Sequence, residues 1–450
     1  MNVRFPNSRR WVKAACMGVA AALVAACGSS SSTGSTSNQA SAPGITATSV
    51  TIGSTQPLTG PAAPGYSEIS PGSSAYFKYV NAHGGVFGRS INYKFLDDGY
   101  NPTNTASLTR QLVLQDSVYA VFDSLGTPTH LAVVDYLNQE KVPDLFVASG
   151  CNCWNNVSAH PYTFGWQPNY TTEGKILGSY IKKTYAGMKV GYFAQGPNDE
   201  FGDDGIAGLN DVLNNGSVTV VTPPQFYAPT SAGAMGVKAE MAAMQAAGVQ
   251  VIASFSIPLF TADAMASAAS INYHPQFVVS NVGSDVPTLT AILTGGSLGA
   301  TLPAALLTGM TSDTYLPLVG DTSNPWISLF KSIATQYAPN LPWDGNVLYG
   351  EAVAYTFVQS LKAAGQNPTR ADIVHAVENS HFTDGPGLPP FAYSATNHLG
   401  YTGVQVDVLG AGSVQQTVGP VYVTDDTAGG AVTQFSGTAS TPPTSGIPSD

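Results

Sequence analysis

Residues 79–102 read YVNAHGGVFGRSINYKFLDDGYNP, and the fold depends on the transitions within this stretch. The segment leading into it, PGSSAYFKYVNAH (71–83), has helical spacing of apolar residues and ends at Gly84-Gly85, which is a typical helix stop. INYKFLDD (91–98) then has the composition of a strand, and NTASLTRQLVLQD (104–116) is helical again. This succession of helix, strand and helix predicts an α/β protein.

The same alternation extends in both directions from this stretch. A strand-like run, SVTIGST, comes before it at 49–55, and others follow at 118–124 and 143–149. After a break at 160–170 the alternation restarts and continues to PQFVVSN at 275–281. Strands that alternate with helices of about ten to fifteen residues predict parallel sheets covered on both faces. We therefore expect two doubly wound, Rossmann-like α/β lobes, with a ligand cleft at the carboxyl ends of the strands.

The N-terminus has the pattern of an exported lipoprotein. Residues 1–26 combine a basic head with a short apolar run and small residues before Cys27, which predicts a lipoprotein signal peptide too short to span a bilayer. The Ser, Thr and Gly-rich residues 27–44 predict a flexible tether. Acylation of Cys27 would hold the protein at the extracytoplasmic face of the cell membrane.

The charge balance argues against a nucleic-acid partner. The chain has 17 basic and 28 acidic residues, and four of the basic ones belong to the signal peptide, so the mature chain carries a net charge of −15. A body this acidic repels a phosphate backbone.

Several blocks in one order resemble a known family. VTIGSTQPLTG, the stretch at 79–102, LGTPTHLAVVDYLNQEKVPDLFVASG and NDEFGDDGIAGLNDV are similar to the type I periplasmic binding proteins of ABC importers, in the branched-chain amino-acid and amide group. The resemblance covers residues 45 to 410. It implies a monomeric, two-lobed clamp with a three-strand hinge, which captures a small organic ligand and delivers it to an importer permease. A sensor module of the same fold is the alternative function.

The resemblance also implies where the lobes begin and end. Lobe 1 would comprise residues 45–165 and 310–385, and lobe 2 would comprise residues 166–309 and 386–427. The tail at 428–450 is rich in Gly, Thr, Ser and Pro, a composition that predicts disorder.

Ligand-binding residues follow from the matched loops. Thr127 would grip a carboxylate at a helix start, although Thr127 or Thr129 would serve equally as a helix cap. Phe201 would lie over the ligand, with a core position as its alternative, and Tyr315 would either reach the cleft or pack in the hinge. Asn281 stands where relatives that bind α-amino acids have an acidic residue. An amide supplies no charge for a buried ammonium, so an amide, carboxylic acid or aromatic acid becomes a candidate beside branched-chain amino acids.

The second ligand loop, ASGCNCW (148–154), contains the only two cysteines of the folded body. The resemblance implies that Ser149 and Gly150 contact the ligand and that Cys151 lies in the pocket wall. Outside the cytoplasm the two thiols favour a Cys151–Cys153 disulfide, with two reduced thiols as the alternative. Zinc would need two further ligands, and only His160 lies near in the sequence.

No pattern for catalysis is present in the sequence. The seven histidines are scattered, and neither HExxH, GxSxG nor a phosphate-binding loop occurs. We therefore expect neither an enzyme nor a cofactor.

Overall fold

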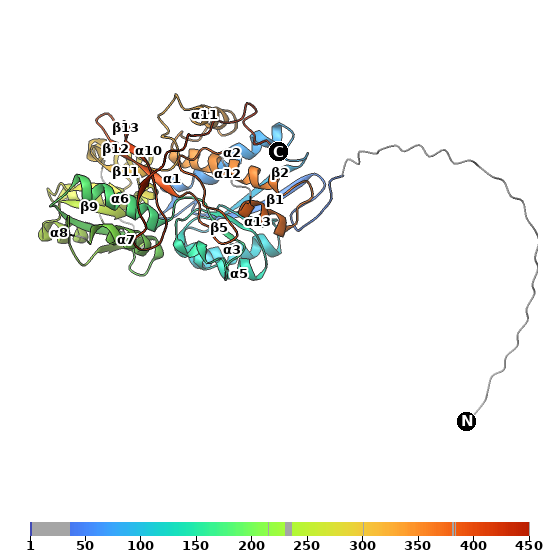
Figure 1. Ribbon diagram of the computed structural model, residues 1–450, viewed down its shortest axis with the longest axis horizontal. Coiled ribbons are helices and arrows are strands. Elements are labelled where there is room, and N and C mark those ends of the chain that lie inside the picture. The colour runs from blue at the N-terminus through green and yellow to red at the C-terminus, as the bar shows by residue number, and fades with distance from the viewer. Residues whose placement is uncertain are drawn as a thin grey trace, which may run out of the picture. The chain divides into compact units, whose positions relative to one another are not determined.

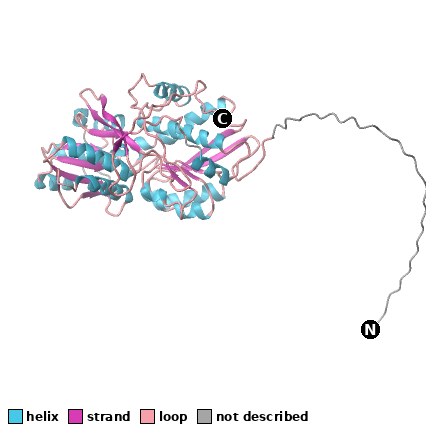
Figure 2. Cartoon of the chain, in the orientation of Figure 1, coloured by secondary structure: helices cyan, strands magenta, loops and turns pink. Residues whose placement is uncertain are grey.

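The computed structural model describes Met1 and residues 37–214, 216–229, 236–299, 301–379, 382 and 384–449. The expected signal peptide, Cys27 and most of the tether lie outside these residues. Within them, no helix has both the length and the apolar character needed to cross a membrane. Residues from Asn38 onward form one compact unit of two lobes, each built on its own sheet with helices around it (Figures 1 and 2).

Lobe 1 is built on a fully parallel sheet of five strands. The strand order is β2 (Ser90–Asp97), β1 (Ser49–Gln56), β3 (Val121–Phe122), β4 (Asp144–Val147) and β5 (Thr163–Gly165). Helices lie on both sides of it: α2 and α12 are above the sheet in Figure 1 and α3 to α5 below. The helices are α1 (Ala63–Tyr66), α2 (Ile69–Ala82), α3 (Pro102–Leu114), α4 (Thr127–Leu131), α5 (Val134–Gln139), α11 (Pro325–Tyr337), α12 (Gly345–Ala363) and α13 (Arg370–Asn379).

Lobe 2 is built on a larger, mixed sheet. Its order is β14 (Thr433–Gln434), β13 (Gln415–Val423), β12 (Gly403–Leu409), β11 (Thr311–Thr314), β10 (Gln276–Val279), β9 (Val251–Phe255), β6 (Lys189–Gln195) and β7 (Thr219–Val220), with β8 (Gln225–Tyr227) also on β6. Strands β12 to β14 are antiparallel and the others are parallel. The helices are α6 (Tyr170–Thr184), α7 (Glu200–Leu213), α8 (Lys238–Ala247), α9 (Pro258–Ser270) and α10 (Val286–Thr294). The two doubly wound α/β lobes expected from the alternation are confirmed.

The stretch at 79–102 joins α2 to β2 through specific contacts. Gly85 has a φ of +70°, and a Cβ there would overlap the carbonyl of Arg89, so only glycine fits this turn. The Asn81 side chain then binds Ile91 in both directions, donating to its carbonyl at 2.9 Å and accepting from its N–H at 2.8 Å. Arg89 is buried and donates to the carbonyls of Thr46 and Gln39 at 2.6 and 2.9 Å. These bonds set where β2 enters the sheet.

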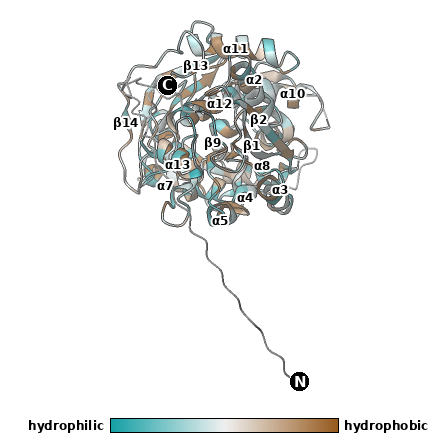
Figure 3. Cartoon of the chain, turned by 90° about the vertical axis from the view of Figure 1, so that its right-hand side faces the viewer, coloured by the Kyte–Doolittle hydropathy of each residue, from teal (hydrophilic) through white to brown (hydrophobic). Residues whose placement is uncertain are grey.

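Helix α12 is buried over nearly its whole length because it lies between α2 and α13 (Figure 3). A helix that is apolar all round must be covered on every side. Its Phe357 packs edge-on against Phe77 and Phe122, with ring centroids 5.9 and 5.2 Å apart. This aromatic cluster forms the centre of lobe 1.

Up to β14 the chain crosses between the lobes three times, at positions that differ in part from those expected. The first crossing follows β5. The second follows β11, whose strand Thr311–Thr314 belongs to the sheet of lobe 2, so lobe 1 resumes after Thr314 and not at 310. The third follows Tyr401, because residues 391–401 still pair beside β5, where Gly165 donates to the carbonyl of His398 at 3.0 Å. The polar strand TSDT gives no hydrophobic signal that would mark it as part of lobe 2.

The tail also differs from the disordered segment expected from its composition. β14 pairs with β13, and the chain then runs along the helices of lobe 1. Trp326 donates its Nε1–H to the carbonyl of Ser440 at 2.9 Å, and Tyr76 donates its hydroxyl to the carbonyl of Gly446 at 2.9 Å. Side chains from far along the sequence satisfy the backbone of the tail, and composition alone does not report such partners.

Candidate functional site

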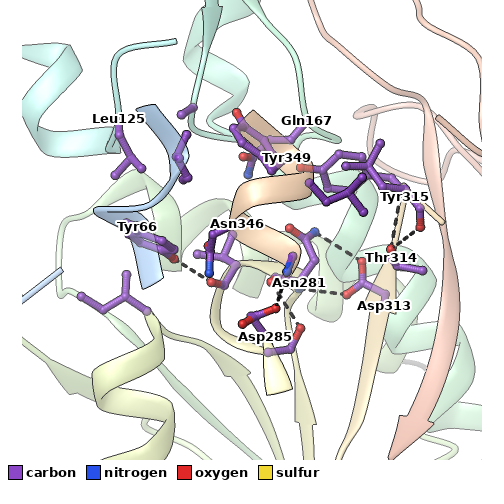
Figure 4. A pocket seen from close by; sticks show the side chains of 18 of the residues that line it. Tyr66, Leu125, Gln167, Asn281, Asp285, Asp313, Thr314, Tyr315, Asn346 and Tyr349 are labelled. Atoms are coloured by element: carbon purple, nitrogen blue, oxygen red, sulfur yellow. Dashed lines mark hydrogen bonds between the residues drawn. The ribbon is translucent and has the colours of Figure 1, made fainter. Parts of the chain in front are cut away.

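A cavity of about 150 Å³ lies between the lobes, at the carboxyl ends of the strands. Lobe 1, lobe 2 and the crossings all contribute to its wall, and Figure 4 shows a part of it. The residues that line it are Tyr66, Ile69, Tyr100, Leu125, Gly126, Thr127, Ala148, Gln167, Tyr170, Phe201, Ile257, Asn281, Val282, Ser284, Asp285, Asp313 to Val319, Gly345, Asn346, Leu348, Tyr349 and Gln415.

The loop after β3 supplies the wall from lobe 1. Gly126 has a φ of +107°, and a Cβ there would overlap Tyr100, so glycine lets the chain turn directly into α4. Thr127 lines the cavity, and its hydroxyl is hydrogen-bonded to that of Ser149 at 2.7 Å. Neither threonine caps α4: its N-cap is Gly126 with no side-chain cap, and Thr129 donates back to the carbonyl of Leu125 at 2.6 Å. Thr127 is thus on the cavity side, as the ligand-contact hypothesis requires.

The loop after β4 is placed differently from the prediction. Ala148 lines the cavity, but Ser149, Gly150 and Cys151 do not belong to the lining. Ser149 lies behind Thr127, and Gly150 is packed so tightly against Pro168 and Tyr170 that a Cβ would overlap them. Cys151 is buried and joined to Cys153 by a disulfide with a Cα–Cα distance of 5.1 Å. The expected ligand contacts of these three residues are therefore corrected: they lie behind the wall.

The disulfide loop instead faces lobe 2. Asn152, between the two cysteines, donates its backbone N–H to the Asp204 carboxylate at 2.8 Å and its side-chain amide to the Thr171 hydroxyl at 2.7 Å. Trp154, fully buried, donates to the carbonyl of Ser149 at 3.0 Å and packs edge-on against His130. Burial raises the pKa of Asp204 to about 6. His160, the residue weighed as a zinc ligand, is hydrogen-bonded to Asp135.

Phe201 lies in the first turn of α7 and lines the cavity from lobe 2. Asp199 caps this helix by accepting the N–H of Phe201 at 3.0 Å, which fixes the direction of the side chain. The ring packs against Tyr170 with centroids 4.6 Å apart and against Phe255 at 6.1 Å. Phe201 is therefore both a core residue and a part of the cavity wall, and its contact with a ligand stays a prediction.

Asn281 lines the cavity and is held from behind by two buried carboxyl groups. Its backbone N–H and side-chain amide donate to Glu173 at 2.7 and 2.9 Å, and its backbone N–H also reaches Asp313 at 3.2 Å. Burial raises the pKa of Glu173 to about 7, and burial together with the charge of Glu173 raises that of Asp313 well above its usual range. The two carboxyls therefore share a proton near neutral pH.

Sequence reasoning did not find Glu173 and Asp313. Glu173 lies in the first turn of α6, where an acidic residue is ordinary, and Asp313 lies in the short polar strand β11. Only the packing of α6 against the end of the lobe 2 sheet makes them a pair. An acidic residue within an otherwise strand-like run was the one available signal for Asp313.

Aromatic residues form much of the remaining wall. The tyrosines are Tyr66, Tyr100, Tyr170, Tyr315 and Tyr349. Tyr315 lines the cavity and also packs against Trp166 and Tyr401 in the crossings, at 5.8 and 5.6 Å between centroids, so both of its proposed positions hold. The other tyrosines were missed because they are scattered through the chain and carry no motif.

Hydrogen bonds between the lobes surround the cavity. Tyr66 donates to the carbonyl of Val282 at 2.6 Å, and Gln195 donates to the Tyr100 hydroxyl at 3.3 Å. Asp285 caps α10 through Thr288 and accepts the N–H of Gly345 from lobe 1 at 2.8 Å. Together with the bond from Asn152 to Asp204, these contacts show that the described conformation is a closed one.

Comparisons with known proteins agree with this architecture. A family model described as "Periplasmic binding protein" matches residues 49–412. The Leu/Ile/Val-binding protein homolog 3 of Brucella melitensis is 24% identical over 218 residues, which is 45% of this chain and 53% of that protein. The match thus spans about half of the length of this curated relative.

Solved structures share the two-lobed fold over nearly their whole length. The fatty acid ABC transporter substrate-binding protein from Thermomonospora curvata has a TM-score of 0.71 at 20% identity, covering 86% of this chain and 95% of that one. A branched-chain amino acid ABC transporter protein from Thermus thermophilus with bound valine has a TM-score of 0.70 at 18% identity, covering 84% and 98%. The resemblance found in the sequence is thereby confirmed, and because the family model spans both lobes, the chain belongs to the periplasmic binding protein family.

Proposed function

We propose that this protein is a lipid-anchored, extracytoplasmic solute-binding protein that captures a small organic ligand between its lobes and delivers it to an ABC importer. The cavity between the lobes, whose wall both lobes supply, is the observation that carries the proposal. A ligand in such a cavity touches both lobes only when they are closed, so binding shifts the equilibrium towards the closed form. A permease would then distinguish the loaded protein from the empty one.

The chemistry of the cavity wall narrows the class of ligand. Aromatic and aliphatic side chains alternate with hydroxyl and amide groups, a lining that suits an apolar body with one polar end. The names of similar proteins include ligands of this kind, valine and fatty acids. Our candidates are branched-chain amino acids, amides, and carboxylic or aromatic acids.

A thermal-shift screen of these compounds tests the proposal. A ligand at a hundred times its dissociation constant stabilises the folded form by about 2.7 kcal/mol, which is a readily measured rise in melting temperature. Calorimetric titration of each hit should give one site per chain, and mass spectrometry should recover the ligand unchanged. A screen without a hit contradicts solute binding, and chemical conversion of the ligand contradicts a pure binding role.

The lipid anchor is tested separately from ligand binding. Wild-type protein expressed with its N-terminus should fractionate with membranes and take up radiolabelled palmitate. Cys27→Ala should lose both properties, whereas Cys16→Ala, which changes the cysteine inside the expected signal peptide, should retain them. Soluble wild-type protein without label would contradict the anchor and leave the binding function standing.

Import and sensing are the two uses of such a clamp that remain to be separated. Deletion of the gene should reduce uptake of the radiolabelled ligand by whole cells if the protein serves an importer. Unchanged uptake, together with a changed transcriptional response to the ligand, would favour the sensor.

A further inference from the structure

Gln167 is a cavity-lining residue that no motif indicated. It lies in the first crossing between the lobes and is 7% exposed (Figure 4). Its neighbours hold the backbone: Trp166 accepts the N–H of Tyr401 at 2.9 Å and donates its Nε1–H to Thr356 at 3.1 Å, and Asn169 caps α6. The side chain therefore enters the cavity from a fixed point.

The side-chain nitrogen of Gln167 has no hydrogen-bond partner within the described part of the chain. Its Nε2 is a buried donor without any hydrogen bond there. An unsatisfied buried donor costs about 1–3 kcal/mol, so such groups occur where something else supplies the acceptor. Because Gln167 faces the cavity, a bound molecule is the natural source of that acceptor.

Both charged residues among the described residues of the lining are acidic. Lysine, arginine and histidine do not occur among them, and the acidic residues are Asp285 and Asp313. Asp285 already accepts the N–H of Gly345, the N–H of Thr288 and the Thr288 hydroxyl. A ligand ammonium would find no free carboxylate there, and burying it unpaired is costly.

The position at which relatives that bind α-amino acids have an acidic residue also offers no carboxylate. Asn281 occupies it, and its donors are turned towards Glu173, which lies behind the wall, and Asp313. Burial raises the pKa values of both acids, so the pair holds a proton and is not a free dianion that attracts cations. The wall thus offers donors and apolar surface, and its two carboxyl groups already accept hydrogen bonds from the protein.

We propose that the ligand carries a carboxylate or amide carbonyl that accepts a hydrogen bond from Gln167, an apolar body packed among the aromatic rings, and no ammonium group. This inference rests on the proposed solute-binding function and narrows it. Gln167 becomes a specificity-determining residue of the cavity.

Two matched probe series test the inference by calorimetric titration at neutral pH. The first is leucine, 4-methylpentanoate and 4-methylpentanamide; the second is phenylalanine, 3-phenylpropanoate and 3-phenylpropanamide. Within each series only the ammonium and the acceptor change. We expect the acid or the amide to bind at least about tenfold more tightly than the amino acid, because only the amino acid must also bury an ammonium group. The ratio of acid to amide tells which carbonyl group the site prefers.

Variants of Gln167 test the hydrogen bond itself. Gln167→Leu should weaken the better probe about tenfold, since one hydrogen bond is lost. Gln167→Glu should weaken the acid at least about tenfold more than the amide, because like charges then meet in the cavity. This ratio does not depend on the fraction of folded protein. Gln245→Leu, on the surface of α8, is the control and should leave every affinity within about twofold.

The outcomes separate the inference from the function on which it rests. If an amino acid is the tightest probe, or if Gln167→Leu binds the acid and amide as wild type does, the inference is wrong and solute binding stands. If all six probes fail while the wider screen finds a ligand that bears an ammonium, the inference is again overturned. If the wider screen finds nothing, the proposed function fails as well.

Discussion

Two loops of lobe 1 follow neighbouring parallel strands and yet face different parts of the molecule. The loop after β3 turns at Gly126 into α4 and lines the cavity with Thr127. The loop after β4 runs past the cavity, forms the Cys151–Cys153 disulfide and presents Asn152 to lobe 2. In α/β sheets, ligands bind at the carboxyl ends of the strands, which predicts that both loops lie near the cavity. The direction of each loop is decided by what packs against it.

The glycines of the two loops show the physical difference. Gly126 has a positive φ, which permits an immediate turn into a helix next to Tyr100. Gly150 is needed for a close approach, because Pro168 and Tyr170 of the first crossing pack on it and leave no room for a side chain. The loop after β3, here called the cavity loop, therefore lines the cavity. The loop after β4, here called the rim loop, holds the closed lobes together.

Trp154 contacts both loops, so its replacement should lower the free energy of unfolding more than any other change proposed here. Trp154→Ala deletes a fully buried ring that contacts His130 of α4 and holds the carbonyl of Ser149. We expect the free energy of unfolding to fall by about 3–5 kcal/mol in urea titrations followed by circular dichroism. Trp343→Ala, which removes a ring that is only half-buried, should cost clearly less. Equal losses would show that the two loops share no support at Trp154.

Asp204 should make the rim loop, and not the cavity loop, sensitive to pH. Burial raises the pKa of its carboxyl from 3.8 to about 6, so the unfolded chain is ionised between pH 4 and 6 while the folded chain stays protonated. The contribution of Asp204 to the free energy of unfolding therefore falls as pH rises through this window and is level above it.

Asp204→Asn should remove this part of the pH dependence. About two pKa units correspond to at most roughly 3 kcal/mol, measured as the difference in unfolding free energy between pH 4 and pH 6.5. Asp203→Asn, at the neighbouring position, should keep most of the wild-type dependence, because burial is the largest cause of the raised Asp204 pKa and the charge of Asp203 is a smaller one. An unchanged profile in Asp204→Asn would show that this carboxyl does not titrate at the rim.

The disulfide should matter more for the shape of the rim loop than for global stability. Replacing Cys151 and Cys153 by serine removes a very short covalent loop, so the unfolding free energy should fall by at most about 2 kcal/mol. Closure should weaken more visibly, as a larger radius of gyration in X-ray scattering of the ligand-free protein. Alkylation without reductant should leave the wild-type mass unchanged, and two added groups would refute the bond.

Thr127→Val should give the smallest effect, confined to the cavity. The side chains are close in shape, so the change removes a hydroxyl that lines the cavity and bonds Ser149. We expect affinity for the best ligand to fall about threefold to tenfold, with the scattering profile unchanged. A loss of closure instead would mean that the two loops do not have separate roles.

Features that depend on local interactions could be predicted from the sequence, and features that depend on contacts between distant residues could not. The glycine stop at 84–85 and the alternation around it predicted the lobe architecture, because these signals are local. Thr127, Phe201, Asn281 and Tyr315 all reached the cavity, since each follows a strand or begins a helix at the predicted edge. Glu173, Asp313 and Gln167 were missed, because each stands in an ordinary local context and gains its role from a distant partner.

The sequence by itself determined the two α/β lobes and the edge at which they meet, because hydrophobic period and glycine turns act over a few residues. The family followed from the resemblance of several motif blocks in one order. The tertiary structure alone decided which side chains face the cavity. In that structure Ser149 and Cys151 lie behind the cavity wall, and the tail packs on lobe 1. Glu173 lies beside Asp313. These arrangements arise from contacts between residues far apart in the chain, and no local pattern encodes such contacts.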